Sequence, residues 1–207
     1  MPKAHPVLTL SLPTPIGRLH MAATDREVIR IELPHANAEM RLKIWVALHF
    51  PHASIRSGVS PILKKAATQL ERYFTGGLEI FQIPHRMVGT PFQVRVWEQS
   101  STIPFGETRT YAQVAAAIDS PRATRAVGSA EMANPLPILV PCHRVIGSDG
   151  GLKGYSGGID LKRWLLEHEG DLPERSASRS GQRLHIVAPL SNDSRSARQR
   201  PRSNPRH

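Results

Sequence analysis

Apolar and polar residues alternate over the first third of the chain, which is the pattern of β-strands that bury one face. The alternation covers three runs, at residues 8–12, 19–23 and 29–33, and turn-forming or charged residues separate them. We therefore predict an antiparallel meander with one buried face. Residues 78–83 show the pattern again and predict a further strand.

Two runs with helical spacing lie between the meander and this last strand. The first, at residues 38–49, repeats apolar positions at intervals of a helical turn. The second, at residues 61–75, has Ser60 as a capping residue before it and Gly76 as a stop after it. The helices and strands together predict a small α/β domain over residues 1–88.

Helices dominate the pattern from residue 89 onward. Thr90 and Thr110 each precede a glutamine by three positions, a capping box that opens a helix. The second box opens a short alanine-rich helix, and a turn at 119–121 leads to a helix of small residues over 122–132. Two short helices joined by such a turn form the helix-turn-helix pattern.

The rest of this half is less regular. Residues 133–159 are rich in glycine and proline, apart from a short buried strand or extended run at 136–140. A last helix is predicted at 160–169 from its apolar spacing. We therefore predict a second, mainly α domain over residues 89–170.

The formal net charge is +10, from 27 Lys and Arg against 17 Asp and Glu. Residues 171–207 hold eight arginines against three acidic residues, whereas residues 91–170 hold eight of each sign. The charge agrees with a polyanionic partner without locating its binding site, and a soluble basic protein with a basic tail explains it equally well. The tail has too few apolar residues for a core, so we predict that it is disordered.

No stretch has the length and apolar character of a membrane span, and the N-terminus lacks the apolar segment of a secretion signal. The single cysteine, Cys142, cannot form an internal disulfide, and no Cys/His cluster has structural-zinc spacing. We expect a reduced, cytoplasmic protein that needs neither a metal nor another cofactor.

Cys142 is also the main candidate for chemistry. A lone cysteine is more often a small buried apolar residue than a nucleophile. Here Pro141 precedes it and His143 and Arg144 follow, and cationic neighbours favour the reactive thiolate. Neighbours in an extended segment point to opposite sides, so contact between Cys142 and His143 needs a turn or a bridging water.

Other candidates have ordinary interpretations of equal or greater weight. Glu167 and Glu169 lie in the last turn of a helix, where a carboxylate is disfavoured by the helix macrodipole. A carboxylate in such a position can have a partner elsewhere, and His143 is a candidate. A solvated acidic helix end explains the two residues equally well. Arg125 has the ordinary interpretation of a surface residue, and Tyr111 that of a half-buried packing residue. The glycine-rich run at residues 150–158 is too irregular for a phosphate-binding loop and suggests a flexible wall close to a ligand.

Taken together, these segments resemble a known family. Pro-Cys-His-Arg-Val at 141–145, with Asn134-Pro135 before it and Gly-Tyr-Ser-Gly-Gly at 154–158 after it, is similar to the O6-alkylguanine-DNA alkyltransferases, or methylated-DNA–protein-cysteine methyltransferases. The resemblance is dense over about residues 90–170 and loose over 8–89. It also includes residues 103–108, Tyr111, residues 125–128 and residues 164–170.

The resemblance implies a ribonuclease-H-like α/β domain followed by a winged-helix type of helix-turn-helix domain. It implies a DNA-repair protein that moves an alkyl group from O6-alkylguanine in double-stranded DNA to Cys142, once per molecule, as a monomer and without a cofactor. Repair of O4-alkylthymine is left open. Vertebrate members hold a structural zinc in the N-terminal domain, and this sequence lacks the cysteines for it.

The same resemblance implies a role for each matching residue. Cys142 accepts the alkyl group, His143 takes the thiol proton through a water, and Glu169 orients His143. Asn134 braces the link to the cysteine loop. The base-flipping and DNA-contacting residues are Arg125, which fills the vacated stack, Tyr111, which rotates the nucleotide and protonates guanine, and Thr124, Ala126 and Gly128. The residues that line the substrate pocket are Pro137, Val145, Tyr155, Ser156 and Gly157.

Two other functions remain open at this point. A Cys-His hydrolase would turn over and would need an oxyanion hole, so a permanent gain of mass on the cysteine separates it from a repair protein. An alkyltransferase-like protein would bind the lesion without transfer. Proteins of that kind lack the reactive cysteine, and the presence of Cys142 speaks against this alternative.

Overall fold

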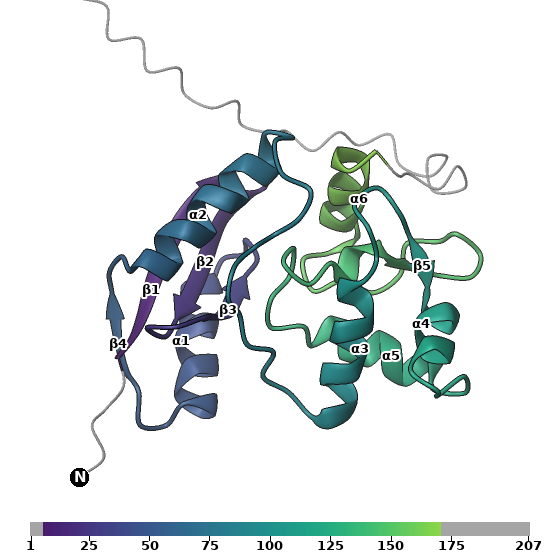
Figure 1. The fold of residues 1–207 in the computed structure, drawn as a ribbon, viewed down its shortest axis with the longest axis horizontal. Coiled ribbons are helices and arrows are strands. Elements are labelled where there is room, and N and C mark those ends of the chain that lie inside the picture. Colours follow the sequence, from purple (N-terminus) through teal and green to yellow (C-terminus); the bar gives the residue numbers. More distant parts are fainter. Residues whose placement is uncertain (1–5, 171–207) are drawn as a thin grey trace, which may run out of the picture.

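A computed structural model describes residues 6–170 of the chain. Its N-terminal half contains a four-stranded sheet in the order β3-β2-β1-β4 (Figure 1). Strands β1 (Pro6–Thr14), β2 (Gly17–Ala23) and β3 (Val28–Glu32) form the predicted antiparallel meander, with Leu12 opposite Leu19. Gly17, at φ 110°, makes the tight turn between the first two strands. Strand β4 (Ser54–Ser57), which the pattern did not predict, pairs parallel with β1.

Helices cover both faces of the sheet, so the prediction of one buried face is wrong. Helix α1 (Ala38–His49) packs Leu42 and Val46 onto one face, together with Val7, Ala22 and Ile29 of the strands. Helix α2 (Pro61–Phe74) covers the opposite face, where Leu19, Met21 and Ile31 are buried. Successive strand residues such as Met21 and Ala22 are therefore both inaccessible, because each points to a different covered side.

Residues 78–83 do not form the predicted strand. Their alternation has another cause, because Leu78, Phe81 and Ile83 pack against the core beside α2. The Gln69 side chain on α2 bonds the main chain of Gln82, accepting from its N–H at 2.8 Å. The segment thus packs three apolar side chains inward and leaves Ile80 exposed, without a neighbouring strand, and Val28 and His85 form an isolated bridge beside it.

The C-terminal half is built from short helices, as predicted. They are α3 (Pro91–Ser101), α4 (Tyr111–Ala117), α5 (Thr124–Met132) and α6 (Ile159–His168), with a single 3-10 turn η1 (Cys142–Arg144). Both predicted capping boxes are present, at the starts of α3 and α4. The turn between α4 and α5 is longer than expected, because Asp119 adopts a left-handed backbone and α5 begins at Thr124 instead of residue 122.

Residues 136–140, predicted as a short buried strand or extended run, form a tight turn instead. The Val140 N–H donates to the Leu136 carbonyl at 2.8 Å, and Ile138 between them has φ 77°. A β-branched residue rarely adopts this conformation, so surrounding contacts must hold it there. A small parallel pair of β5 (Arg109–Thr110) and β6 (Val145–Ile146), which the sequence did not predict, follows the turn and fixes the start of the next loop.

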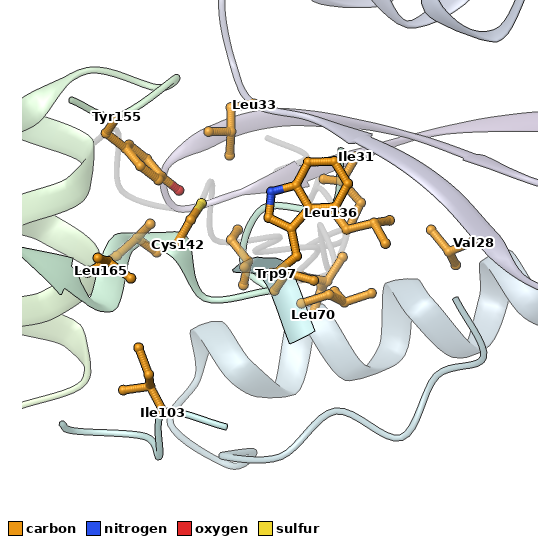
Figure 2. Close-up of a cluster of buried hydrophobic side chains, with 14 of the residues drawn as sticks. Val28, Ile31, Leu33, Leu70, Trp97, Ile103, Leu136, Cys142, Tyr155 and Leu165 are labelled. Atoms are coloured by element: carbon orange, nitrogen blue, oxygen red, sulfur yellow. The ribbon is translucent and has the colours of Figure 1, made fainter. Parts of the chain in front are cut away.

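The two halves share one core. A cluster of buried side chains continues from Ile31 in the sheet through Trp97 to Cys142 and Leu165 (Figure 2). A backbone hydrogen bond of 2.8 Å from the Ile31 N–H to the Pro135 carbonyl joins β3 to the segment just before the tight turn. Cys142 is thus attached to the sheet as well as to the helices. No helix within residues 6–170 is long and apolar enough to cross a membrane.

Gly89, at the connection between the halves, gives a first prediction. A Cβ at this position would lie 2.5 Å from the buried ring of Trp97, whose Nε1 donates to the Ala130 carbonyl at 2.9 Å. The ring cannot retreat, so Gly89→Ala should lower the free energy of unfolding by about 1–3 kcal/mol. Gly77→Ala is the matched control, because its Cβ would meet nothing closer than 3.6 Å. Urea denaturation of both variants tests this, and equal midpoints would contradict it.

Candidate active site

Cys142 is the first residue of η1 and lies directly after the tight turn. Its thiol is buried, and its N–H donates to the Val140 carbonyl at 2.8 Å. The 3-10 conformation supplies the turn that an extended segment lacks. His143 and Arg144 are therefore also directed into the interior, where both are buried.

Asn134 fixes the cysteine loop from the end of α5. Its Nδ2 donates to the Val140 carbonyl at 2.9 Å and to the Cys142 Sγ at 3.0 Å. Its Oδ1 accepts from the Leu136 N–H at 2.9 Å. One amide thus binds both ends of the tight turn and also directs an N–H at the sulfur, which favours the thiolate.

His143 and Glu169 lie together, as expected from the sequence. The His143 Nε2 is 2.9 Å from the Glu169 Oε1, and both side chains are buried. Glu167, the other candidate in that turn, is exposed. Arg144 does not face the thiol. It binds Glu169 through two nitrogens, at 2.7 and 3.0 Å, and donates to the Ile103 carbonyl at 2.6 Å.

Burial determines the protonation of these groups. Burial raises the pKa of Cys142 to about 12, and the charge of Glu131 adds to this, while Asn134 and Lys162 act in the opposite direction. Burial also lowers the pKa of His143. Burial alone would raise the pKa of Glu169, but the hydrogen bonds and charges of His143 and Arg144 outweigh it and hold the pKa below its usual value. At rest the site therefore holds a neutral Cys142 thiol, a neutral His143 imidazole and an ionised Glu169 carboxylate.

The protonation of His143 follows from this pairing. Because the Glu169 carboxylate is ionised, it accepts a hydrogen bond from the His143 Nε2 and fixes the tautomer. The Nδ1 then carries a lone pair. This atom is buried and has no hydrogen-bond partner within residues 6–170. The imidazole can therefore accept a proton on the side that Glu169 does not occupy.

Tyr111 belongs to a second hydrogen-bonded group. Its hydroxyl donates to the Lys153 carbonyl at 2.7 Å, and the buried Lys162 ammonium donates to the Tyr111 oxygen at 3.3 Å. Lys162 also donates to the Val145 carbonyl at 2.5 Å and to the Lys153 carbonyl at 3.0 Å. Burial raises the pKa of Tyr111 and lowers that of Lys162 to about 8. The group holds the glycine-rich loop against the helices.

The expected DNA-contacting residues lie on the outer side of α5. Thr124, Arg125 and Ala126 are exposed, and Gly128 is half-buried with the Tyr111 ring beside it. The Arg125 guanidinium makes no hydrogen bond or ion pair with any residue between 6 and 170. An unengaged arginine is thus presented by a helix of small residues.

The expected pocket residues differ in burial. Pro137, Val145 and Tyr155 are buried, and Figure 2 draws Tyr155 next to Cys142. Ser156 is exposed, and it lines a cavity of about 270 Å³ together with Pro137, Asn134 and residues of β3 and α1. A Cβ on Gly157 would lie 2.6 Å from Leu161 and 2.8 Å from Leu33, so a larger residue would require these leucine side chains to move.

Sequence reasoning missed three buried polar residues at this site. Tyr73 reaches Glu169 from α2, Lys162 reaches Tyr111 from α6, and Glu131 on α5 accepts a hydrogen bond from the Ser100 hydroxyl. Lys162 and Glu131 stand within helical patterns where a charged residue usually faces water, so no signal marked them as buried. Within residues 6–170, no three His, Cys, Asp or Glu side chains are grouped as metal ligands.

Comparison with known proteins identifies the family of the chain. Residues 91–171 match the family described as 6-O-methylguanine DNA methyltransferase, DNA binding domain. The chain is 41% identical over 157 residues to the constitutive methylated-DNA–protein-cysteine methyltransferase of Bacillus subtilis, covering 75% of this chain and 91% of that protein. A methyltransferase of the same name from Methanosarcina barkeri is 54% identical over 106 residues, or 51% of this chain and 67% of that protein.

Solved structures give the same result. The structure of Mycobacterium tuberculosis OGT in complex with DNA superposes with a TM-score of 0.66 at 39% identity, over 79% of this chain and 92% of that one. The O6-methylguanine-DNA methyltransferase of Pyrococcus kodakaraensis superposes with a TM-score of 0.54 at 26% identity, over 80% and 99% of the two chains. The chain belongs to the family of methylated-DNA–protein-cysteine methyltransferases.

Glu131 generates a prediction about stability and pH. Burial raises its pKa to about 7 from 4.5, so the folded protein favours the protonated carboxyl. The stability that this proton gives is complete below the unfolded pKa and is lost as the pH rises through about 7. Glu131→Gln keeps an acceptor for Ser100 and should be more stable than the parent above pH 7, by roughly 3 kcal/mol at most. The difference should vanish near the unfolded pKa.

Chemical denaturation at a series of pH values measures this difference. Glu98→Gln is the matched control, since Glu98 is an exposed acid on the neighbouring helix α3. A gain for Glu131→Gln that stays constant across the series, or that appears equally in the control, would show that the carboxylate is not buried as described.

Proposed function

We propose that this protein repairs DNA by moving the alkyl group of O6-alkylguanine onto its own Cys142. One observation carries the proposal. The buried Cys142 Sγ accepts a hydrogen bond from Asn134 in the same site as an imidazole that burial keeps neutral and that Glu169 holds in the tautomer with a free Nδ1. This arrangement supplies a thiolate only while a proton acceptor is in place, which suits a nucleophile that is used once.

The reaction is a displacement at the alkyl carbon. His143 takes the Cys142 proton through a bridging water, and the sulfur attacks the carbon attached to the guanine oxygen. The carbon–oxygen bond breaks as the carbon–sulfur bond forms, and the released guanine gains one proton, so atoms and charge balance. Tyr111 supplies that proton to the base and regains one from solvent, to which His143 returns the thiol proton, and the hydrogen bond from Lys162 stabilises the transient Tyr111 phenolate. The thioether product does not hydrolyse, so each molecule reacts once.

The target atom lies inside the duplex, so the nucleotide must leave the stack at a cost of a few kcal/mol. We place α5 in the minor groove, where Thr124, Ala126 and Gly128 allow a close approach. Arg125 fills the space that the base vacates. The flipped base enters between Pro137, Val145 and the loop of Tyr155, Ser156 and Gly157, a site on the side of the molecule that holds the cavity of about 270 Å³.

The proposal extends to the domain folds, the oligomeric state and the location of the protein. Residues 6–88, with a mixed sheet between two helices, form a ribonuclease-H-like domain, and residues 89–170 form the winged-helix type of domain that carries both α5 and Cys142. One copy acts on one lesion. We place the protein in the cytoplasm and, for a bacterial cell, at the nucleoid, where its DNA substrate lies. The expectation of a disordered tail at 171–207 lies outside the described residues.

Intact mass measurement tests the transfer. After incubation with duplex DNA that carries O6-methylguanine, the protein should gain the mass of one methylene, and peptide mapping should place it on Cys142. Cys142→Ser should fold and show no gain. A gain on another residue would contradict the mechanism. Release of methanol with many turnovers per molecule would indicate a hydrolase, and tight lesion binding without any gain would indicate a lesion-binding protein.

Arg125→Ala tests the assignment of the DNA-contacting face. Replacing a stacked base is worth about 1–3 kcal/mol, so the variant should transfer from duplex DNA roughly tenfold more slowly or worse. Its transfer from the free alkylated base should be unchanged, because no stack must be filled. Arg26→Ala removes an equal charge from an exposed arginine of the β2–β3 loop and serves as the control. Equal losses with the two substrates would refute the assignment.

A further inference from the structure

Tyr73 connects the N-terminal half of the molecule to the reactive centre. It lies in the last turn of α2 and is fully buried. Its hydroxyl donates to the Glu169 Oε1 at 2.7 Å, across a sequence separation of 96 residues. Its main-chain carbonyl accepts from the His168 Nε2 at 2.8 Å. The last turn of α2 thus binds two successive residues at the end of α6.

Aromatic packing holds the Tyr73 ring in this orientation. The rings of Phe74, Phe81 and Phe105 lie 5.2, 5.5 and 6.2 Å from it, and the His168 ring lies 5.1 Å away. A ring enclosed on so many sides cannot rotate its hydroxyl away from Glu169. The hydrogen bond is therefore a fixed part of the carboxylate's surroundings.

The Glu169 carboxylate distributes its charge over several donors. Its Oε1 accepts from Tyr73, His143 and Arg144, and its Oε2 accepts from Arg144. Donors that share one oxygen compete for its charge, so each weakens the hold of the carboxylate on the others. At Oε1 the Tyr73 hydroxyl therefore competes with His143 and with one nitrogen of Arg144.

We propose that Tyr73 is a positioning residue of the alkyl-transfer reaction, whose hydroxyl limits how strongly Glu169 attracts the proton of His143. The proposal rests on the proposed function, since it concerns the imidazole that takes the Cys142 proton. It makes the N-terminal half a part of the reactive centre. A sheet-and-helix unit that only supported the fold would not need a donor on this oxygen.

Within residues 6–170, three charged side chains and one tyrosine ring lie around His143. Glu169 and Lys162 act on it from α6 and Arg144 from η1, and the Tyr155 ring of the glycine-rich loop lies 6.5 Å from the His143 ring, between ring centroids. Around the Tyr73 hydroxyl the corresponding groups are Glu169 and Arg144, with Tyr155 and the His168 ring on the same side. Among the groups within residues 6–170 that bind the Glu169 carboxylate, only Tyr73 comes from the N-terminal half, so it can be altered without touching the thiol, the imidazole or the guanidinium.

Tyr73→Phe removes one of the three donors from Oε1 and leaves the ring. The carboxylate then draws more strongly on His143, which becomes more basic. A protonated imidazole cannot accept the thiol proton, so the acidic limb of the transfer rate against pH should move to higher pH, by on the order of one unit. In that limb the rate should fall about tenfold, while the rate on the plateau changes little.

A stronger donor should have the opposite effect. Site-specific incorporation at position 73 of a tyrosine fluorinated at both ring carbons beside the hydroxyl keeps the ring and makes the hydroxyl more acidic. The acidic limb should then move to lower pH. This second variant preserves the hydrogen bond, so it also keeps the proposal testable if Tyr73→Phe fails to fold.

Single-turnover transfer from O6-methylguanine duplex DNA, measured from about pH 5 to pH 9 with the full-length chain, tests both variants. Phe81→Leu is the control, because it loosens the packing of the Tyr73 ring and leaves the hydroxyl. It should reduce stability without moving the limb. Profiles of the two Tyr73 variants that match the parent after scaling would overturn the proposal and leave Tyr73 a packing residue. Absence of transfer in the parent would overturn the proposed function instead.

Discussion

A single buried carboxylate, Glu169, determines how the reactive centre is assembled. An ionised carboxylate without partners in the interior costs several kcal/mol, and its place at the end of α6 adds an unfavourable helix dipole. The structure offsets both effects with donors from Tyr73, His143 and Arg144. Because these donors come from α2 and η1, the position of α6 is tied to both halves of the molecule. Loss of this carboxylate would leave the Arg144 guanidinium buried without its ion-pair partner.

The cysteine loop shows how a local backbone arrangement depends on the same core. Ile138 adopts a left-handed conformation that is strained for a β-branched side chain, and it is almost completely buried. Packing and the hydrogen bonds of Asn134 stabilise it. The turn that results brings the Cys142 Sγ to the Asn134 amide. The strain, of order 1–3 kcal/mol, is thus linked to the placement of the thiol.

Much of the helical structure could be predicted from the sequence, because local rules determine it. Both capping boxes are visible as residue types at fixed spacing, and α1 has the predicted bounds. The site residues Cys142, His143, Asn134 and Glu169, predicted from motif order, do lie together. The strands were harder to predict from the sequence. Strand β4 pairs with β1 although the two are far apart in the chain, and residues 78–83 have the alternation of a strand without forming one.

The roles of the buried polar residues Tyr73 and Lys162 could not be predicted, because each role depends on contacts with residues far away in the sequence. Tyr73 occupies an apolar position of an amphipathic helix and fits an ordinary core residue equally well until Glu169 is placed beside it. Lys162 follows the pattern of a surface lysine, yet its ammonium donates to the Tyr111 hydroxyl and to two main-chain carbonyls. Pairwise geometry across the molecule, rather than residue type, identifies both.

The burial of the Cys142 thiol, with a pKa raised to about 12, also bears on chemical selectivity outside the repair reaction. Small electrophiles and oxidants in solution react with exposed thiolates, and this sulfur is neither exposed nor ionised at rest. A molecule that can be used only once is in this way protected from inactivation by the free alkylating agents that damage DNA. The supply of active protein then declines with the number of lesions met rather than with the general reactivity of the surrounding solution.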